Sequence, residues 1–193
     1  MKGVNKFNRS QFYENWKRAS ASAGDCVFIS YSRLDKDYAR TVGAMIRDLG
    51  IDIYFDENDD VLQLADEQNN HEKVVACIED GIARSTTLLG IITENTKQSW
   101  WVPYEIGSAN GHSKPHAHLI TKEVSYLPSY IKASTILTSV DSLDEWLLKY
   151  ARSKLGSTGI LMERMNRVLS GHYKSASIDP VPMHRSITEL SFY

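Results

Sequence analysis

A chain of 193 residues with 42% hydrophobic and 24% charged side chains is long enough for one globular domain with extensions. The formal net charge of -2 provides neither the basic footprint of a nucleic-acid-binding protein nor an acidic tail. No apolar run is long enough to cross a bilayer, and the basic N-terminus lacks the apolar core of a secretion signal. We therefore expect a cytoplasmic protein without a membrane or nucleic-acid partner.

The chain divides into three expected segments. Residues 1–24 predict a helix and a linker, because Phe12, Trp16 and Ala19 recur at helical spacing before a connector of small residues. Residues 25–154 predict one domain. Residues 155–193 predict an amphipathic helix, which covers the domain or binds a partner, and a tail without a clear period.

Strands and helices alternate between the two ends. Short apolar, β-branched runs predict strands at residues 25–31, 51–55, 86–93, 116–121 and 134–138. Apolar residues at helical spacing predict one helix that ends at Gly50, one that spans residues 70–83 and one that begins after Ser99. A capping box at Ser142–Glu145 predicts the start of a further helix. Residues 56–66 and 122–132 are expected to be loops. This alternation predicts an α/β fold with a five-stranded, mainly parallel sheet and helices on both faces. Cys26 and Cys77 lie in apolar patterns that indicate buried, reduced thiols.

The stretch from Ser99 to Gly107 is expected to open a helix at the edge of the sheet where ligands bind. Ser99 is a candidate cap, and Pro103 falls in the first turn. Trp101 and Glu105 are four residues apart, so they share one helical face. An acid beside a large aromatic ring suits a flat cationic ligand; the alternative is a solvated glutamate next to tryptophans that fill the core. The fold favours a site, because ligands gather beyond the carboxyl ends of parallel strands.

Four stretches together resemble the TIR (Toll/interleukin-1 receptor) domain over about residues 25–154, which implies a flavodoxin-like, three-layer fold. They are Val27–Tyr31, Gly50–Asp56, Ile82–Thr93 and Ser99–Glu105, the last matching the S-x-W-x-x-x-E pattern of NAD-cleaving members. Two features depart from the pattern. The segment after the second strand is acidic and lacks the usual glycine, and Ser32 stands where many enzymatic relatives have a basic residue, with Arg33 as a substitute.

The resemblance implies cleavage of the bond between nicotinamide and ribose in NAD+, which is the substrate, so no cofactor is expected. Nicotinamide leaves as a neutral molecule, so a single carboxylate suffices to stabilise the developing positive charge. Glu105 is the candidate catalytic residue. The candidate substrate-binding residues are Phe28, Tyr31, Ser32, Arg33 and Trp101.

The chain is most similar to bacterial Thoeris-type TIR proteins. That similarity implies that the enzyme makes a signal nucleotide derived from ADP-ribose, which then activates a separate effector protein. It also implies a phage-derived trigger and self-association through TIR–TIR contacts. A non-catalytic TIR adaptor that acts by self-association is one alternative. A nucleoside deoxyribosyltransferase-like enzyme, with Glu105 as a covalent nucleophile, is another.

No metal site is expected. His112, His116 and His118 lack a cysteine or acid at a recognised ligand spacing. The acidic run Asp56–Asp60 is expected to be a solvated loop that faces an assembly partner rather than a magnesium site.

Overall fold

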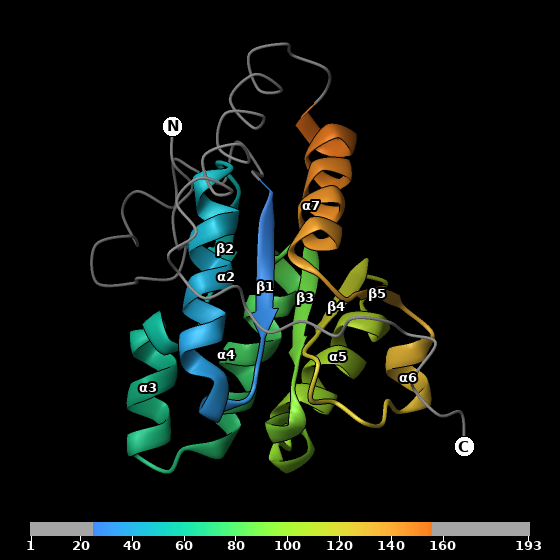
Figure 1. The fold of residues 1–193 in the computed structure, drawn as a ribbon. Coiled ribbons are helices and arrows are strands. Elements are labelled where there is room, and N and C mark those ends of the chain that lie inside the picture. Colours follow the sequence, from blue (N-terminus) through green and yellow to red (C-terminus); the bar gives the residue numbers. More distant parts are fainter. Residues whose placement is uncertain (1–24, 156–193) are drawn as a thin grey trace.

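Five parallel strands form one sheet in the computed structural model, which describes residues 25–155 and, for residues 151–155, the backbone alone (Figure 1). The strand order across the sheet is β2-β1-β3-β4-β5. The strands are β1 (Cys26–Ser30), β2 (Asp52–Tyr54), β3 (Thr87–Ile92), β4 (His116–Ile120) and β5 (Thr135–Leu137). The predicted α/β fold is confirmed. The N-terminal helix and linker and the C-terminal helix and tail lie outside the described residues.

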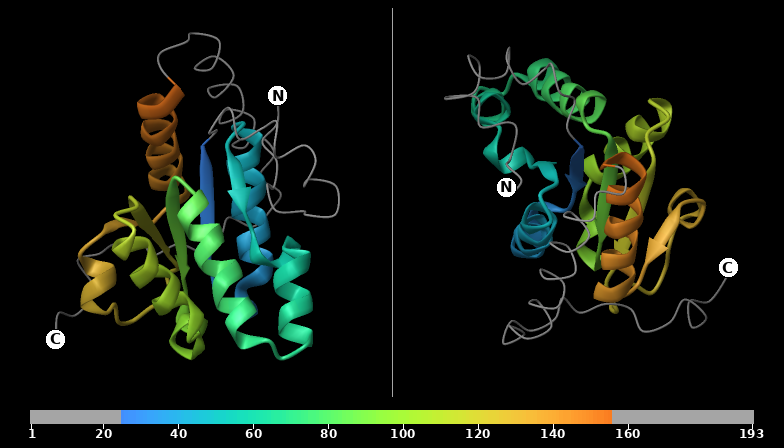
Figure 2. Two further views of the ribbon diagram at one scale, coloured as in Figure 1. Left: turned by 180° about the vertical axis from the view of Figure 1, so that it is seen from behind. Right: turned by 90° about the horizontal axis from the view of Figure 1, so that it is seen from above.

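Helices cover both faces of the sheet, as the views from behind and above show (Figure 2). The α-helices are α2 (Lys36–Asp48), α3 (Asp60–Glu67), α4 (His71–Arg84), α5 (Trp101–Gly111), α6 (Ser129–Lys132) and α7 (Val140–Leu155). The short 3-10 helices within residues 25–155 are η1 (Arg33–Asp35), η2 (Asp56–Asn58) and η3 (Glu94–Gln98).

The side-chain alternation of the strands produces two separate cores. Val27 and Ile29 of β1 pack with apolar residues of α2 and α7. Phe28 faces the other way and packs with residues of α3, α4, α5 and α6. Both faces of β1 and β3 are buried, which explains their nearly continuous apolar sequences. Cys26 and Cys77 are buried thiols, as predicted.

The predicted loop over residues 56–66 is wrong, because this segment contains η2 and most of α3. Asp59 is fully buried, and its side chain accepts hydrogen bonds from the backbone N–H groups of Val61 (3.1 Å) and Leu62 (3.2 Å). Tyr54 also donates its hydroxyl to Asp59 at 3.1 Å. The acidic run is thus a helix start with a buried N-cap rather than a solvated loop.

The start of α7 also differs from the prediction. The helix begins at Val140, so Ser142 is its third residue and not its cap. The Ser139 hydroxyl accepts from the Ser142 N–H, and the Ser142 hydroxyl accepts from the Ser139 N–H, both at 3.0 Å. This is a capping box with serine in the place usually taken by glutamate. The loop predicted over residues 122–132 likewise ends in α6.

His118 lies in β4, an interior strand of the sheet. It is fully buried, and neither ring nitrogen has a hydrogen-bond partner among the described residues. In the register of the sheet, Ser30 pairs with Gly90, and Gly90 pairs with His118. The imidazole lies over Gly90, because a Cβ built on that glycine would be 2.6 Å from Nδ1 of His118. The absence of a side chain at Gly90 therefore leaves space for the imidazole ring of His118.

We expect Gly90→Ala to lower the free energy of unfolding by about 1–3 kcal/mol, because the added methyl would overpack the site of His118. Gly107→Ala is the matched control. It lies within α5, where an added Cβ meets no atom within 4 Å, so better helix propensity should stabilise the protein by about 0.5–1 kcal/mol. Urea unfolding of the two variants measures both values. Equal stability of Gly90→Ala and the wild type would show that the ring has room to move.

Candidate active site

Glu105 is buried in α5, which packs against β1 and β3. Its side chain is only 5% exposed. The Ser30 hydroxyl, at the carboxyl end of β1, donates a hydrogen bond of 2.5 Å to Oε2 of Glu105. The carboxyl group is therefore fixed between the first strand and the helix that the sequence places at this edge of the sheet.

The surroundings of Glu105 favour its neutral form. Burial raises its pKa to about 8, the hydrogen bond from Ser30 opposes this rise, and the negative charge of Asp56 adds to it. A positive charge brought close to the carboxyl group would shift the balance toward the carboxylate.

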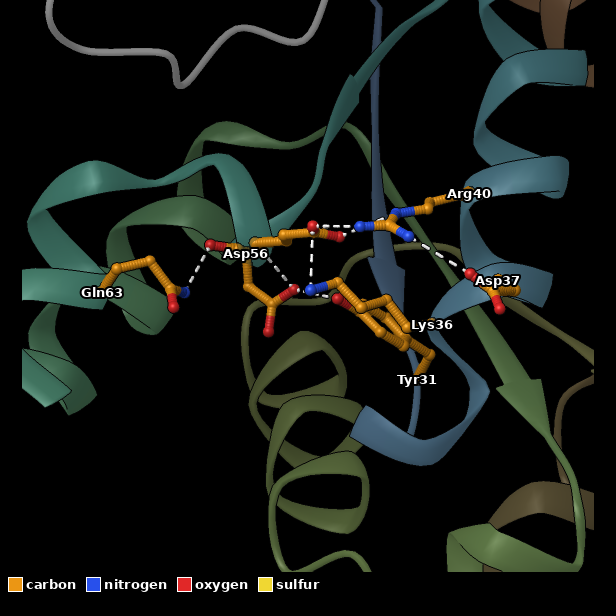
Figure 3. Close-up of polar contacts among 7 residues, drawn as sticks. Tyr31, Lys36, Asp37, Arg40, Asp56 and Gln63 are labelled. Atoms are coloured by element: carbon orange, nitrogen blue, oxygen red, sulfur yellow. Dashed lines mark hydrogen bonds and ion pairs between the residues drawn. The ribbon is translucent and has the colours of Figure 1, made fainter. Parts of the chain in front are cut away.

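Tyr31 and Asp56 form a second pair beside Glu105. The Tyr31 hydroxyl donates a hydrogen bond of 2.6 Å to Oδ1 of Asp56, at the start of η2 (Figure 3). Burial and the nearby charge of Asp56 raise the pKa of Tyr31, so its hydroxyl stays protonated and keeps donating. The Tyr31 ring also stacks on Phe55, with 4.9 Å between ring centroids. This pair joins the end of β1 to the segment that follows β2.

Basic residues of α2 hold the same segment from the other side. Glu57 accepts from Lys36 at 2.9 Å and from two nitrogens of Arg40 at 2.5 and 3.1 Å. Arg40 also pairs with Asp37, and Gln63 donates to the backbone carbonyl of Asp56 at 3.1 Å (Figure 3). The η2 segment is therefore anchored by polar contacts to β1 and α2.

Trp101 lies at the start of α5 on a more exposed part of the surface. It is 41% exposed and meets Tyr104 edge to face, with 5.8 Å between ring centroids. Tyr104 donates a hydrogen bond of 2.6 Å to Glu79 of α4, and Ser108 donates one of 2.8 Å to the same carboxylate. Trp100 takes the N-cap position of α5, and Ser99, the predicted cap, lies one residue earlier and accepts from the Val102 N–H of the first turn at 3.2 Å. The position of α5 is thus fixed at its start and along its outer face.

The other three candidate residues contact groups other than Glu105. Phe28 is 1% exposed and stacks on Tyr54 in the core. Ser32 is buried, and its backbone carbonyl accepts from the Asp35 N–H at 2.7 Å. Arg33 is exposed and lies 3.4 Å from Asp66 of α3. The structure therefore brings together Tyr31 and Glu105, through Asp56 and Ser30, more closely than it does Arg33 or Trp101.

A groove of about 300 Å³ lies next to the start of α5. Its lining includes Trp100, Pro103, Tyr126 and Tyr130, but neither Trp101 nor Glu105. The buried carboxyl group and this aromatic hollow are therefore two separate features of the same sheet edge.

No group of three or more histidine, cysteine, aspartate or glutamate side chains within residues 25–155 is arranged to hold a metal ion. Within the same range, no helix has the length and apolar character needed to span a membrane.

The fold agrees with a comparison against known protein families. The TIR domain family matches residues 27–146, which is more than half of the chain. The chain belongs to the TIR domain family. A comparison with curated proteins finds no match to it. TIR domains self-associate, and they act on NAD+ or serve as adaptors, so the family supports either kind of function for this member.

Sequence analysis missed two residues that contact the candidate residues directly. Ser30 was visible only as the last residue of a buried strand, and a hydroxyl at the carboxyl end of a parallel strand is the signal that identifies it. Asp56 was hidden within an acidic run that reads as a solvated loop. Its role depends on contact with Tyr31, 25 residues away, which no local pattern reports.

Proposed function

We propose that this TIR domain cleaves the bond between nicotinamide and ribose in NAD+, with Glu105 as the catalytic carboxylate. The observation that carries the proposal is a buried carboxyl group, held by Ser30, at the carboxyl edge of the sheet. The match of Ser99, Trp101 and Glu105 to the pattern of NAD-cleaving members supports it further.

The chemistry needs one carboxylate rather than a pair. The bond from ribose C1′ to the pyridinium nitrogen breaks, and its two electrons go to that nitrogen, so nicotinamide leaves neutral without a general acid. Positive charge then develops on the ribose, where the ionised Glu105 stabilises it. Water, or another nucleophile such as the adenine ring, forms the new bond to C1′ and loses a proton. Pairs of carboxylates in most glycosidases protonate a leaving oxygen, a step that this reaction lacks.

The bound pyridinium also sets the charge of the carboxyl group. In the described arrangement the pKa of Glu105 is about 8, so much of the protein carries a neutral carboxyl group at pH 7. A cationic ring in the same low-dielectric space favours the carboxylate, so binding of NAD+ and release of the proton are linked. Trp101 is proposed to stack on a ring of the dinucleotide. Tyr31, Phe28, Ser32 and Arg33 form the opposite side of the proposed site.

We propose a signalling role in bacterial anti-phage defence, similar to Thoeris systems. In this role a phage-derived trigger activates the protein in the cytoplasm, and a nucleotide made from ADP-ribose carries the signal to a separate effector. The test is turnover of NAD+ by the purified protein at high concentration, with products separated by liquid chromatography and mass spectrometry. The mass of the second product distinguishes ADP-ribose, its cyclic form and an acceptor-linked form. No nicotinamide release, either alone or in lysate of phage-infected cells, would favour the adaptor function.

Self-association is proposed to complete the active site. Because Glu105 is only 5% exposed, NAD+ reaches it only after neighbouring groups move, and contact with a second subunit can supply the free energy for that change. We expect nicotinamide release per subunit to rise with protein concentration, in parallel with the mass measured by light scattering. Turnover per subunit that stays constant across the association range would contradict this expectation.

The rate should depend on pH through Glu105. Because its pKa in the unliganded protein is about 8, kcat/KM for NAD+ should rise up to tenfold per pH unit below that value and level off above it. The pKa seen in kcat should be lower, because the pyridinium favours the carboxylate in the bound state. Initial rates from pH 5.5 to 9.5 measure both profiles. A profile of kcat/KM that is flat from pH 5.5 to 8 would exclude this ionisation.

A further inference from the structure

A second hollow, of about 240 Å³, lies between α2 and the segment formed by β2 and η2. Its lining combines small and apolar residues with two arginines, one acid and one amide. These residues are Ala39, Arg40, Gly43, Ala44, Arg47, Ile53, Phe55, Glu57 and Asn58. Two guanidinium groups beside one carboxylate give this hollow an excess of positive charge.

The two arginines differ in how their nitrogens are bonded. Arg40 makes a two-point contact with Glu57, at 2.5 and 3.1 Å, and a third contact with Asp37 at 3.2 Å. Nε of Arg47 is buried and has no hydrogen-bond partner within residues 25–155. A buried N–H donor of a cationic group is costly to leave without an acceptor. The hollow is therefore lined by Arg47, whose buried Nε lacks an acceptor, and by Arg40, whose guanidinium is held by carboxylates.

We infer that this hollow binds a phosphate group between Arg40 and Arg47, in exchange for the contact of Glu57 with Arg40. A carboxylate that accepts two parallel hydrogen bonds from a guanidinium has the same geometry as two oxygens of a phosphate. Glu57 thus occupies the place of the ligand on Arg40 in the described structure. After the exchange its carboxylate keeps Lys36, 2.9 Å away, as a partner.

This site is separate from the one proposed for NAD+ cleavage. Ile53 and Phe55 belong to the core on the α2 side of the sheet, whereas α5 and Glu105 lie on the opposite side. The two are connected along the chain, because Glu57 directly follows Asp56, the partner of Tyr31. An anion that displaces Glu57 therefore acts on the segment next to Glu105 without contacting Glu105.

Calorimetric titration of the purified protein at low salt, with inorganic phosphate, pyrophosphate or ADP-ribose, tests the inference. The three probes distinguish a free phosphate from a phosphate carried by a nucleotide. Arg47→Gln should weaken binding by roughly tenfold or more, because it removes a charge-assisted contact. Arg47→Lys, which keeps the charge but loses the planar fork, should weaken it less. Glu57→Gln should tighten binding severalfold, because the neutral amide competes poorly for Arg40.

Two matched controls remove a charge outside the hollow. Arg84→Gln breaks the pair with Asp80 on α4, and Glu94→Gln breaks the pair with Lys97. Both should leave the affinity within about twofold of the wild type, because exposed pairs contribute little. The same affinity in the wild type and Arg47→Gln, or no binding of any probe, would overturn the inference. Neither result depends on NAD+ turnover, so failure of the proposed enzyme and failure of this site are distinguishable.

Discussion

Glu105→Gln should lower kcat for nicotinamide release from NAD+ by roughly 100- to 1000-fold, which corresponds to about 2.7–4 kcal/mol of transition-state stabilisation. The amide has nearly the same shape as the carboxyl group and still accepts the hydrogen bond from Ser30. It lacks the negative charge that opposes the developing charge on the ribose. The loss should therefore appear in kcat, measured by chromatography of nicotinamide at saturating NAD+.

Two further variants show whether the loss comes from Glu105 itself. Ser30→Ala removes the 2.5 Å hydrogen bond to Glu105 and should reduce kcat less than Glu105→Gln does, because the charge remains. Glu94→Gln removes a carboxylate whose side chain is 41% exposed and paired with Lys97, and should retain full activity. Nicotinamide release by Glu105→Gln at the wild-type rate would exclude Glu105 as the catalytic residue.

Local patterns predicted most of the fold because each element depends on nearby residues. The buried strand β3 was recognisable from its apolar run. Gly50 was expected to stop the helix before it, and it follows α2 with a φ of 87°, a backbone conformation that favours glycine. Failure came where tertiary contacts override composition. Asp59 lies within an acidic run, but Tyr54 and two backbone N–H groups make it a buried cap, and so the segment after it forms α3.

The site was predictable to a smaller extent. Glu105 was predicted from its spacing to Ser99, just before α5, and to Trp101, the first residue of α5. The contacts of Glu105 and Tyr31, by contrast, span 75 and 25 residues along the chain. The first exists because α5 packs against β1, and the second because β1 and β2 run side by side in the sheet. Phe28 lies two residues before Ser30, on the same face of β1, and its ring stacks on Tyr54 in the core of that face, so its place in the site stays a prediction.

The same Glu105→Gln change should stabilise the protein at neutral and alkaline pH. Glu105 has a pKa of about 8 in the folded protein and 4.5 as a model value for the unfolded chain. Because the folded pKa is raised, the favourable contribution of Glu105 is fully present below pH 4.5 and is lost as the pH rises toward 8. Glutamine does not titrate, so the variant should be more stable than the wild type by about 3 kcal/mol at pH 7 and by nothing at pH 4.

Thermal unfolding of both proteins between pH 4 and 9 measures this difference, with roughly 10 °C expected at pH 7 for a domain of this size. The buried His118 has a pKa of about 4, so acid destabilises both proteins equally below about pH 6.5, and its effect cancels in the comparison. Glu94 supplies the control of opposite sign, because its pair with Lys97 lowers its pKa, so Glu94→Gln should gain no stability at pH 7. If Glu105 is a catalytic carboxyl group held at a cost in stability, Glu105→Gln loses catalysis and gains stability. If Glu105 is purely structural and held as a carboxylate, the same substitution loses stability.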